Sequence, residues 1–328
     1  MHRMNNPEVS ILIPVYNRER FVVDAIESAC RQTLSNIEII VVDNQSTDQT
    51  YQVACTLAET DSRIKVFQND TNLGPVLNWQ RCISFASADV SKILWSDDWI
   101  DSTYLEVTVP MLLENEDVGF IYTSVKNHSQ EFIRVIYDQL PETGLYDLSI
   151  FIEDHLFWGE RFPVSPGCAL FRTRDLKKNL LLDIPNDLGL DYKKYGQGND
   201  LLLFLLCDKD YSKFGFQKQA LSHFRAHDGC LSAAEDLSIY ILDSMRYFVE
   251  TQKGGNYKNR YFSFLYLRSR SSVKGKLHKA VLSNKAFQID LIFMLSWRLK
   301  KTLKRILKKI SNFRNELGRT AHKISHID

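Results

Sequence analysis

Residues 9–17 read Val9-Ser10-Ile11-Leu12-Ile13-Pro14-Val15-Tyr16-Asn17, an apolar run closed by two polar side chains. A run this apolar is typical of a strand that is buried on both faces of a parallel sheet. A helical pattern follows over residues 21–34, and a second apolar run begins at Ile37. Strand, helix and strand at this spacing predict a βαβ unit with a right-handed crossover.

The same alternation continues along the next hundred residues. It predicts strands over residues 37–42, 64–67 and 92–95, and helices over 46–59, 75–86 and 104–113. The pattern becomes irregular from 118 to 222, with strands near 118–124 and 164–171 and a helix over 199–208, and residues 233–328 are expected to be helical throughout. We therefore expect an α/β fold with a Rossmann-like, mostly parallel sheet flanked by helices.

Composition limits the class of protein. The chain has 328 residues, 44% of them hydrophobic and 25% charged, as in a soluble globular protein. Its six cysteines are scattered without a Cys-x-x-Cys pair, which argues against a zinc site or a disulfide framework and favours a reducing compartment. We expect no signal peptide in the polar residues 1–8 and no membrane-spanning stretch.

Polar or acidic side chains follow four successive predicted strands. Tyr16 and Asn17 follow the first strand, Asp43 the second, Asn72 the third, and the adjacent Asp97 and Asp98 the fourth. Parallel strands end at one edge of a sheet, where open α/β folds bind their ligands. Tyr16 offers a stacking face and Asp43 a carboxylate for a base or ribose. Ordinary turn chemistry explains each residue singly, whereas one nucleotide site explains their common edge.

Asp97 and Asp98 are the most informative pair in the chain. Two neighbouring carboxylates repel each other unless a cation, a proton or solvent offsets their charge. Mg²⁺ or Mn²⁺ bridging these oxygens to a phosphorylated ligand is the functional interpretation. The alternative is an acidic N-cap for the helix over residues 104–113.

Together these motifs resemble the family 2 glycosyltransferases of the GT-A fold. The resemblance covers about residues 9–125 strongly and 126–230 loosely, and it rests on residues 9–17, 25–33, 37–43, 46–48, 72–74 and 96–98. It implies a GT-A domain over residues 1–232, with a nucleotide-sugar-binding half (1–125) and an acceptor half (126–232). Residues 233–328 would follow as a helical C-terminal extension.

The resemblance also implies roles for single residues. Asp43 should bind uracil or thymine, and Asp97 and Asp98 should meet the ribose and a metal-bound diphosphate, with His227 as an additional ligand. The nucleotide site would comprise Pro14, Tyr16, Asn17, Asp43, Asn72 and Asp97. One departure is clear, because many relatives read Asp-x-Asp-Asp where this chain has Trp95-Ser96-Asp97-Asp98.

A catalytic base is expected at Asp200, which resembles the acid of the family's Glu-Asp segment, although Asn199 replaces the glutamate. An N-cap before an apolar helix is the alternative for Asp200, and Asp187 and Asp191 are nearby competitors. Arg225 and His227 resemble a family segment that would neutralise the diphosphate or complete the metal shell; the alternative is a structural or solvated pair. Gly167 falls where relatives build the acceptor pocket, or in a simple turn. Glu153, Asp154 and His155 are predicted to form a solvated face.

The C-terminal residues are strongly basic. Residues 255–328 hold 18 Lys and Arg but only 3 Asp and Glu, a net charge of +15, whereas the rest of the chain holds 23 and 37, a net charge of −14. Over residues 297–317 apolar side chains recur at helical spacing with basic ones between them, which predicts a helix attracted to an anionic membrane surface. The alternatives are a helix docked on the body and, less favoured, nucleic-acid binding.

The sequence therefore predicts a metal-dependent, inverting glycosyltransferase, cytoplasmic and peripheral on the inner face of the cell membrane. The resemblance implies a UDP- or dTDP-sugar donor, a glycan or lipid-linked saccharide acceptor, and a role in surface polysaccharide synthesis. Two alternatives stay open: a catalytically degenerate scaffold, and a sugar nucleotidyltransferase, which would need a glycine-rich triphosphate loop that residues 16–20 lack. No nucleic-acid partner is expected.

Overall fold

Parallel strands form the half of the sheet that the sequence pattern predicted. In the computed structural model, β3 (Ile64–Gln68), β2 (Ile37–Asp43), β1 (Val9–Val15) and β4 (Val90–Ile93) lie side by side in that order. Val9 pairs with Ile37 on one side and with Val90 on the other, all in parallel register. Every residue of β1 and β2 is buried, as expected for strands covered on both faces.

The other half of the ten-stranded sheet is mixed. It continues from β4 through β9 (Ala169–Arg172), β6 (Val118–His128), β10 (Lys213–Arg225) and β5 (Trp99–Ile100). β9 runs antiparallel to both neighbours, whereas β6 and β10 are parallel to each other. The short strands β7 (Ile133–Ile136) and β8 (Gly144–Asp147) add antiparallel pairs to β6 and β10.

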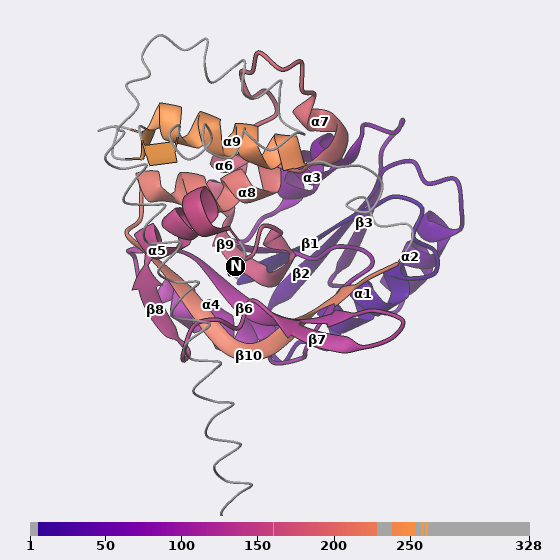
Figure 1. Ribbon diagram of the computed structural model, residues 1–328. Helices are drawn as coiled ribbons and strands as arrows, with labels where there is room; N and C mark the ends of the chain where they lie inside the picture. Colours follow the sequence, from indigo (N-terminus) through magenta and orange to yellow (C-terminus); the bar gives the residue numbers. More distant parts are fainter. Residues whose placement is uncertain (1–5, 160, 228–237, 253–256, 259, 262–328) are drawn as a thin grey trace, which may run out of the picture. The chain divides into compact units, whose positions relative to one another are not determined.

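Helices cover both faces of the sheet (Figure 1). α1 (Val22–Cys30), α2 (Thr50–Ala58) and α4 (Tyr104–Leu113) share one apolar core with the odd-numbered residues of β1. α3 (Pro75–Phe85) covers the opposite face, where Cys82 and Asn78 bond backbone carbonyls of β2. α6 (Thr173–Asn179), α7 (Tyr192–Tyr195) and α8 (Asn199–Leu205) continue that layer through contacts with α3 and with each other.

One local prediction is wrong. Glu153, Asp154 and His155 do not form a solvated face, because Asp154 and His155 are buried where α5 (Leu148–Glu153) widens into the π-helical turn Asp154–Trp158. Asp154 Oδ1 accepts a hydrogen bond from Arg161 Nε at 2.5 Å. Burial lowers the pKa of His155 to about 4. The aromatic core beneath this turn explains the burial; it comprises Phe120, Phe151, Phe162, Phe204 and Phe214.

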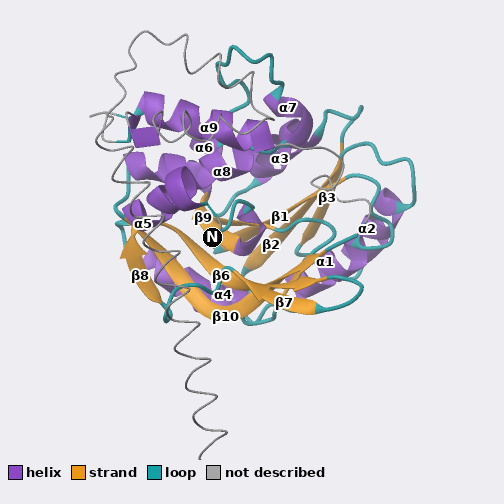
Figure 2. Ribbon diagram, viewed as in Figure 1, coloured by secondary structure: helices purple, strands orange, loops and turns teal. Residues whose placement is uncertain are grey.

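The structure describes residues 6–159, 161–227, 238–252, 257–258 and 260–261. Contacts divide the chain into two units, residues 1–252 and 253–328, so the first unit includes α9 (Ser238–Thr251), beyond the boundary predicted at residue 232. α6, α8 and α9 lie together on one side of the sheet (Figure 2). The predicted basic helix over 297–317 lies outside the described residues. Among the described helices, none is both long and apolar enough to cross a bilayer.

Candidate active site

The loops after β1 and β2 are fastened to each other. Asn17 adopts a left-handed backbone conformation (φ 51°), a region that asparagine tolerates better than most residues. Its N–H donates to Ser46 Oγ at 2.9 Å, and its side-chain Oδ1 accepts from Thr47 N at 2.8 Å. The Asn17 side chain therefore shapes the site. Tyr16, 40% exposed beside it, presents an open aromatic face, and Pro14 is buried within β1.

Asp43 ends β2 as a fully buried carboxylate. Its Oδ2 accepts hydrogen bonds from Ser46 N and from Gln68 Nε2, both at 3.0 Å. Its Oδ1 is buried and has no hydrogen-bond partner among the described residues. An unpaired buried acceptor costs about 1–3 kcal/mol, so this oxygen is suited to an N–H group that a ligand supplies.

Asn72, in the loop after β3, is committed to its own loop. Its Oδ1 accepts from Asn44 Nδ2 at 2.8 Å and from Gly74 N at 2.9 Å. Asn44 in turn accepts from Leu73 N at 2.9 Å. The predicted residue thus lies at the expected edge, where it holds the shape of the loop with its side chain.

Asp97 and Asp98 lie between β4 and β5 and meet the end of β10. Asp97 Oδ2 accepts from His227 Nε2 at 2.9 Å and from Arg18 Nε at 3.4 Å. Asp98 Oδ1 accepts from Arg225 N at 2.9 Å, and Arg225 Nε donates to the Asp97 carbonyl at 3.1 Å. The structure therefore brings the predicted pair Asp97 and Asp98 together with Arg225 and His227. The bonded partners are 127 to 130 positions apart in the chain.

The helix-cap alternative for the acidic pair is wrong, because the N-cap of α4 is Thr103. Asp98 is 7% exposed, and burial together with the neighbouring negative charge of Asp97 raises its pKa well above the usual range. The Arg225 guanidinium lies over the rings of Trp99 and Phe21, at 4.8 and 4.9 Å, and pairs with Asp24 at 2.5 Å. The acidic pair thus has a fixed cationic neighbour.

The acidic pair fits a divalent cation. Repulsion between Asp97 and Asp98 is the kind of stress that a cation relieves, and among described residues Asp97 Oδ1 accepts no hydrogen bond. Within the described ranges no group of three or more His, Cys, Asp or Glu side chains is arranged as a metal site by itself. Oxygens of a bound diphosphate and water would therefore have to complete the shell, as is usual for Mg²⁺.

Trp95, which replaces the family's leading acid, forms a wall of the site. Its Nε1–H donates to Ser165 Oγ at 2.8 Å. A Cβ atom on Gly167 would lie 2.6 Å from the indole ring, so only glycine fits there. From below, the buried Lys92 donates to the Gly167 carbonyl. Burial lowers the pKa of Lys92 to about 7.

Asp200 lies in the first turn of α8 and is partly exposed. Its Oδ1 accepts from Gly198 N at 2.9 Å and from Leu201 N at 2.8 Å. Burial of the carboxyl group raises the pKa of Asp200 to about 7, and these backbone hydrogen bonds only partly oppose that shift. Its competitors differ: Asp191 caps α7 by accepting from Lys193 N, and Asp187 is exposed.

Aromatic side chains connect the segment just before Asp200 with Trp95, which precedes the acidic pair. A Cβ atom on Gly196 would lie 2.3 Å from the Trp79 ring, and the rings of Trp79 and Trp95 are 4.7 Å apart. Tyr137, in a left-handed conformation (φ 58°), approaches from the segment after β7. Burial is the main cause of its raised pKa, with further contributions from Cys168 and Asp200.

Several residues of the site were not predicted from the sequence. Arg18 follows the first strand within three residues, but the sequence alone does not distinguish it from the charged residues beside it, Glu19 and Arg20. Gln68 and Lys92 lie within strands and resemble ordinary sheet residues. Tyr137 has no signal in the sequence, because only tertiary folding brings its loop to Asp200.

Comparisons with known proteins agree with this geometry. A sequence model described as glycosyl transferase family 2 matches residues 10–180. An uncharacterized glycosyltransferase of Haemophilus influenzae is 36% identical over 112 residues, which are 34% of this chain and 45% of the relative. The putative glycosyltransferase EpsH of Bacillus subtilis is 39% identical over 104 residues, 31% of this chain and 30% of that protein. Each match thus spans less than half of the relative.

Solved structures show the same fold. The crystal structure of S. aureus TarS 1-349 in complex with UDP-GlcNAc superposes with a TM-score of 0.61 at 18% identity, over 88% of this chain and 79% of that one. A central sheet flanked by helices, with acidic side chains at its strand ends, defines a GT-A-type protein. Because the family's sequence model covers more than half of the chain, this chain belongs to glycosyl transferase family 2.

Proposed function

We propose that this chain is a metal-assisted, inverting glycosyltransferase. It moves a hexosyl or N-acetylhexosaminyl group from a UDP- or dTDP-sugar to a glycan or lipid-linked saccharide in surface polysaccharide synthesis. The observation that carries the proposal is Asp200, a carboxylate with a pKa of about 7 at a helix start that aromatic contacts join to the acidic strand end. A base with this pKa is matched to abstracting a proton near neutral pH.

The donor side rests on Asp43 and Tyr16. The unpaired Oδ1 of Asp43 accepts the imide N–H that uracil and thymine share, and this base stacks on the exposed Tyr16 ring. Solved complexes of S. aureus TarS with UDP and with UDP-GlcNAc support a nucleotide sugar as the donor. Either pyrimidine satisfies the same carboxylate, so the base does not select between UDP and dTDP.

The diphosphate lies against Asp97, Asp98, Arg225 and His227 in this proposal. Mg²⁺ or Mn²⁺, when bound to the two carboxylates, supplies Lewis-acid stabilisation of charge on the departing diphosphate. Arg225 and Arg18 add fixed positive charge beside Asp97. Pairing with Asp97 orients the His227 imidazole, which either assists the cation or donates to a phosphate oxygen.

The acceptor side rests on Asp200 and the wall formed by Trp95 and Gly167. Ionised Asp200 accepts the proton of the acceptor hydroxyl as that oxygen attacks the anomeric carbon, and the bond to the diphosphate breaks on the opposite face. A single displacement of this kind inverts the anomeric configuration. The lipid-linked acceptor and attachment to the inner membrane surface rest on residues 297–317 of the sequence.

Calorimetry with UDP tests the donor site. We expect UDP to bind the full chain with an affinity that rises at least tenfold when Mn²⁺ is added. Asp97→Asn should remove this metal effect, whereas Asp147→Asn, a change to an exposed carboxylate on β8, should keep it. Equal affinity with and without Mn²⁺ would contradict the metal role, and no UDP binding at all would favour the scaffold alternative.

Release of nucleoside diphosphate tests the reaction. A panel of UDP-glucose, UDP-galactose, UDP-N-acetylglucosamine and dTDP-rhamnose, with simple methyl glycosides as acceptors, identifies the donor that the chain uses. Asp200→Asn should abolish release while UDP binding stays unchanged. Asp187→Asn is the matched control on the neighbouring loop. Full turnover by Asp200→Asn would show that another group is the base.

A further inference from the structure

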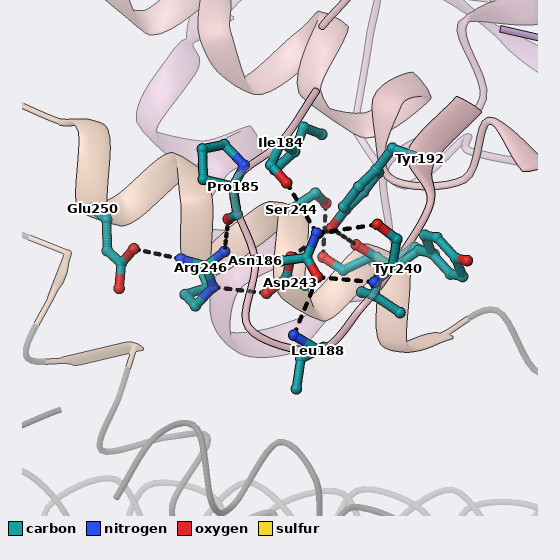
Figure 3. Close-up of polar contacts among 12 residues, drawn as sticks. Ile184, Pro185, Asn186, Leu188, Tyr192, Tyr240, Asp243, Ser244, Arg246 and Glu250 are labelled. Atoms are coloured by element: carbon teal, nitrogen blue, oxygen red, sulfur yellow. Dashed lines mark hydrogen bonds and ion pairs between the residues drawn. The ribbon is translucent and has the colours of Figure 1, made fainter. Parts of the chain in front are cut away.

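A buried charged network joins α9 to α7 (Tyr192) and to the loop before α7 (Figure 3). Asp243 of α9 is 1% exposed. Its Oδ2 accepts from the Tyr192 hydroxyl of α7 at 2.8 Å, and its Oδ1 accepts from Arg246 Nε at 2.7 Å. One oxygen of this buried carboxylate therefore connects α9 to α7, and the other is bonded within α9.

Arg246 ties the same network to the loop that precedes α7. Its guanidinium pairs with Glu250 at 2.5 Å and donates to the Pro185 carbonyl at 2.5 Å. That loop is closed on itself by Asn186, whose Oδ1 accepts from Leu190 N at 2.9 Å. Figure 3 shows these groups converging on one face of α9. α9 therefore holds the chain from Pro185 to Tyr192 in one arrangement.

Gly198 transmits this arrangement to the catalytic carboxylate. It has a left-handed backbone (φ 92°), and a Cβ atom there would lie 2.8 Å from both Tyr192 Cε1 and the Tyr240 carbonyl oxygen. That carbonyl is also the second, longer acceptor, at 3.2 Å, of the single hydroxyl hydrogen that Tyr192 shares with Asp243. Gly198 is thus confined between a ring and a carbonyl that one hydroxyl holds together. Its N–H donates to Asp200 Oδ1 at 2.9 Å.

We infer that Tyr192 and Asp243 are positioning residues for the base: through Gly198 they hold a backbone N–H against the Asp200 carboxylate and so set its orientation. This inference rests on the proposed function, in which Asp200 is the base. It places α9, which the sequence pattern assigned to a C-terminal extension, in the catalytic unit. In this inference the network acts on Asp200 only through Gly198.

A merely structural network would not be expected to involve this chemistry. Replacing a buried ion pair with apolar side chains of similar volume is often neutral or stabilising, so stability alone does not require Asp243 and Arg246 here. The charged groups fix an orientation. Arg246 holds the Asp243 carboxylate in place, and the carboxylate in turn fixes the position of the Tyr192 hydroxyl. The ring of Tyr192 then limits where the Gly198 N–H can lie.

The network has a consequence for pH dependence. The amides of Gly198 and Leu201 donate to Asp200, Tyr192 and Asp243 lie behind Gly198, and the charge of Asp200 also acts on Tyr137. The Gly198 hydrogen bond favours the ionised carboxylate and lowers the pKa of Asp200. If the N–H turns away, that pKa rises above about 7. The acidic limb of the kcat–pH profile then moves to higher pH.

Tyr192→Phe tests the inference, because it keeps the ring and removes only the hydroxyl. With the best donor of the panel and Mn²⁺, we expect kcat at pH 6.5 to fall about tenfold and to recover at pH 9, while KM for the donor is unchanged. Tyr195→Phe, on the same helix, is the matched control, since its hydroxyl makes no hydrogen bond with described residues. An unshifted profile for Tyr192→Phe would overturn the inference.

Asp243→Asn is the second variant and keeps the side-chain shape. It should shift the acidic limb in the same direction as Tyr192→Phe, and the double variant should add little, because both act through Gly198. Calorimetric titration with UDP shows whether each variant is still folded, because the proposed UDP site lies outside this network. If Asp200→Asn retains turnover, the base assignment fails; if Asp200→Asn is inactive and neither network variant shifts the profile, only the positioning role fails.

Discussion

β2 carries a buried carboxylate near each of its ends, and the two have opposite surroundings. Glu38, near the amino end, is 3% exposed, and Asp43, at the carboxyl end, is 0% exposed. Glu38 accepts hydrogen bonds from Ser10 Oγ, Ser87 N and Ser87 Oγ at 2.6 to 2.8 Å and pairs with Lys65 at 2.7 Å. Asp43 has one oxygen that accepts hydrogen bonds and one buried oxygen that has no partner among the described residues.

The difference separates a carboxylate that supports the fold from one that is prepared for a ligand. Burial alone acts to raise the pKa of Glu38, but the hydrogen bonds from Lys65, Ser10 and Ser87 outweigh it and lower that pKa from 4.5. Nothing comparable serves Asp43 Oδ1. An acceptor of this kind persists only if the surrounding structure holds it or a ligand satisfies it. The strand ends therefore differ in function. A polar group whose hydrogen bonds are all made within the protein supports the fold, whereas one with an unbonded buried atom is suited to a ligand.

The largest expected effect concerns Asp200, the third carboxylate in this comparison. In the proposed reaction Asp200 acts in its ionised form, and burial raises its pKa to about 7, so kcat should rise with pH through about 7 and level off above 8. Asp200→Asn should lower turnover by about 10²- to 10⁴-fold. Rates of diphosphate release between pH 5.5 and 9 measure both. A profile that is flat through pH 7 would separate this pKa from catalysis.

Removing the fully hydrogen-bonded carboxylate of Glu38 should lower the stability of the fold. Glu38→Ala leaves the donors of Ser10 and Ser87 without an acceptor, and we expect a loss of about 2–4 kcal/mol in the free energy of unfolding. Chemical denaturation measures this loss, and UDP affinity of the folded fraction should not change. Since the pKa of Glu38 is lowered by folding, its contribution is complete above pH 4.5 and is lost as pH falls through the lowered pKa. Weaker UDP binding would contradict the division of roles.

Changing Asp43, whose Oδ1 is unbonded within the part of the chain that the structure describes, should weaken ligand binding more than it lowers stability. Asp43→Asn keeps the shape but turns an NH₂ group either toward Ser46 N and Gln68 or toward the base. We expect UDP affinity to fall about 10- to 100-fold, as for a lost hydrogen bond to a charged group. Calorimetry gives the affinity and thermal unfolding the stability, which should change much less than in Glu38→Ala. A large loss of stability with intact binding would make Asp43 structural.

The smallest effect is expected at Tyr16, whose side chain is exposed. Tyr16→Ala should weaken UDP binding by about 1 kcal/mol, at the lower end of the range for base–aromatic stacking. Tyr16→Phe retains the ring and should bind UDP as the unchanged chain does. Isothermal titrations of the two variants side by side decide this, and equal weakening in both would assign the role to the hydroxyl group.

Much of the fold follows from local sequence patterns. β1, β2 and α4 begin and end within one residue of their predicted bounds, because continuous apolar runs and helical spacing are local properties. β4 begins two residues before its predicted start, since a strand boundary depends on pairing with β1 and β9. The mixed second half of the sheet was not predictable, because antiparallel additions such as β8 leave no pattern.

Some residues of the candidate site were likewise predictable from the local sequence, and others were not. Asp43, Asp97 and Asp98 follow apolar strands directly, so their common edge was predictable from spacing. Arg225 and His227 could be linked to them only through the family resemblance. Asp243 and Tyr192 are 51 residues apart in the chain and meet only after folding. Asp154 was misassigned because three consecutive polar residues resemble a solvated face, whereas a π-helical turn directs two of them inward.

The close fit of Gly167 against Trp95 has an evolutionary consequence. A side chain at 167 and an indole at 95 exclude each other, so neither position can change freely while the other stays as it is. In this chain the indole at position 95 therefore packs against a position without a side chain. In a family alignment the two columns should covary, with tryptophan at position 95 found only beside glycine at position 167.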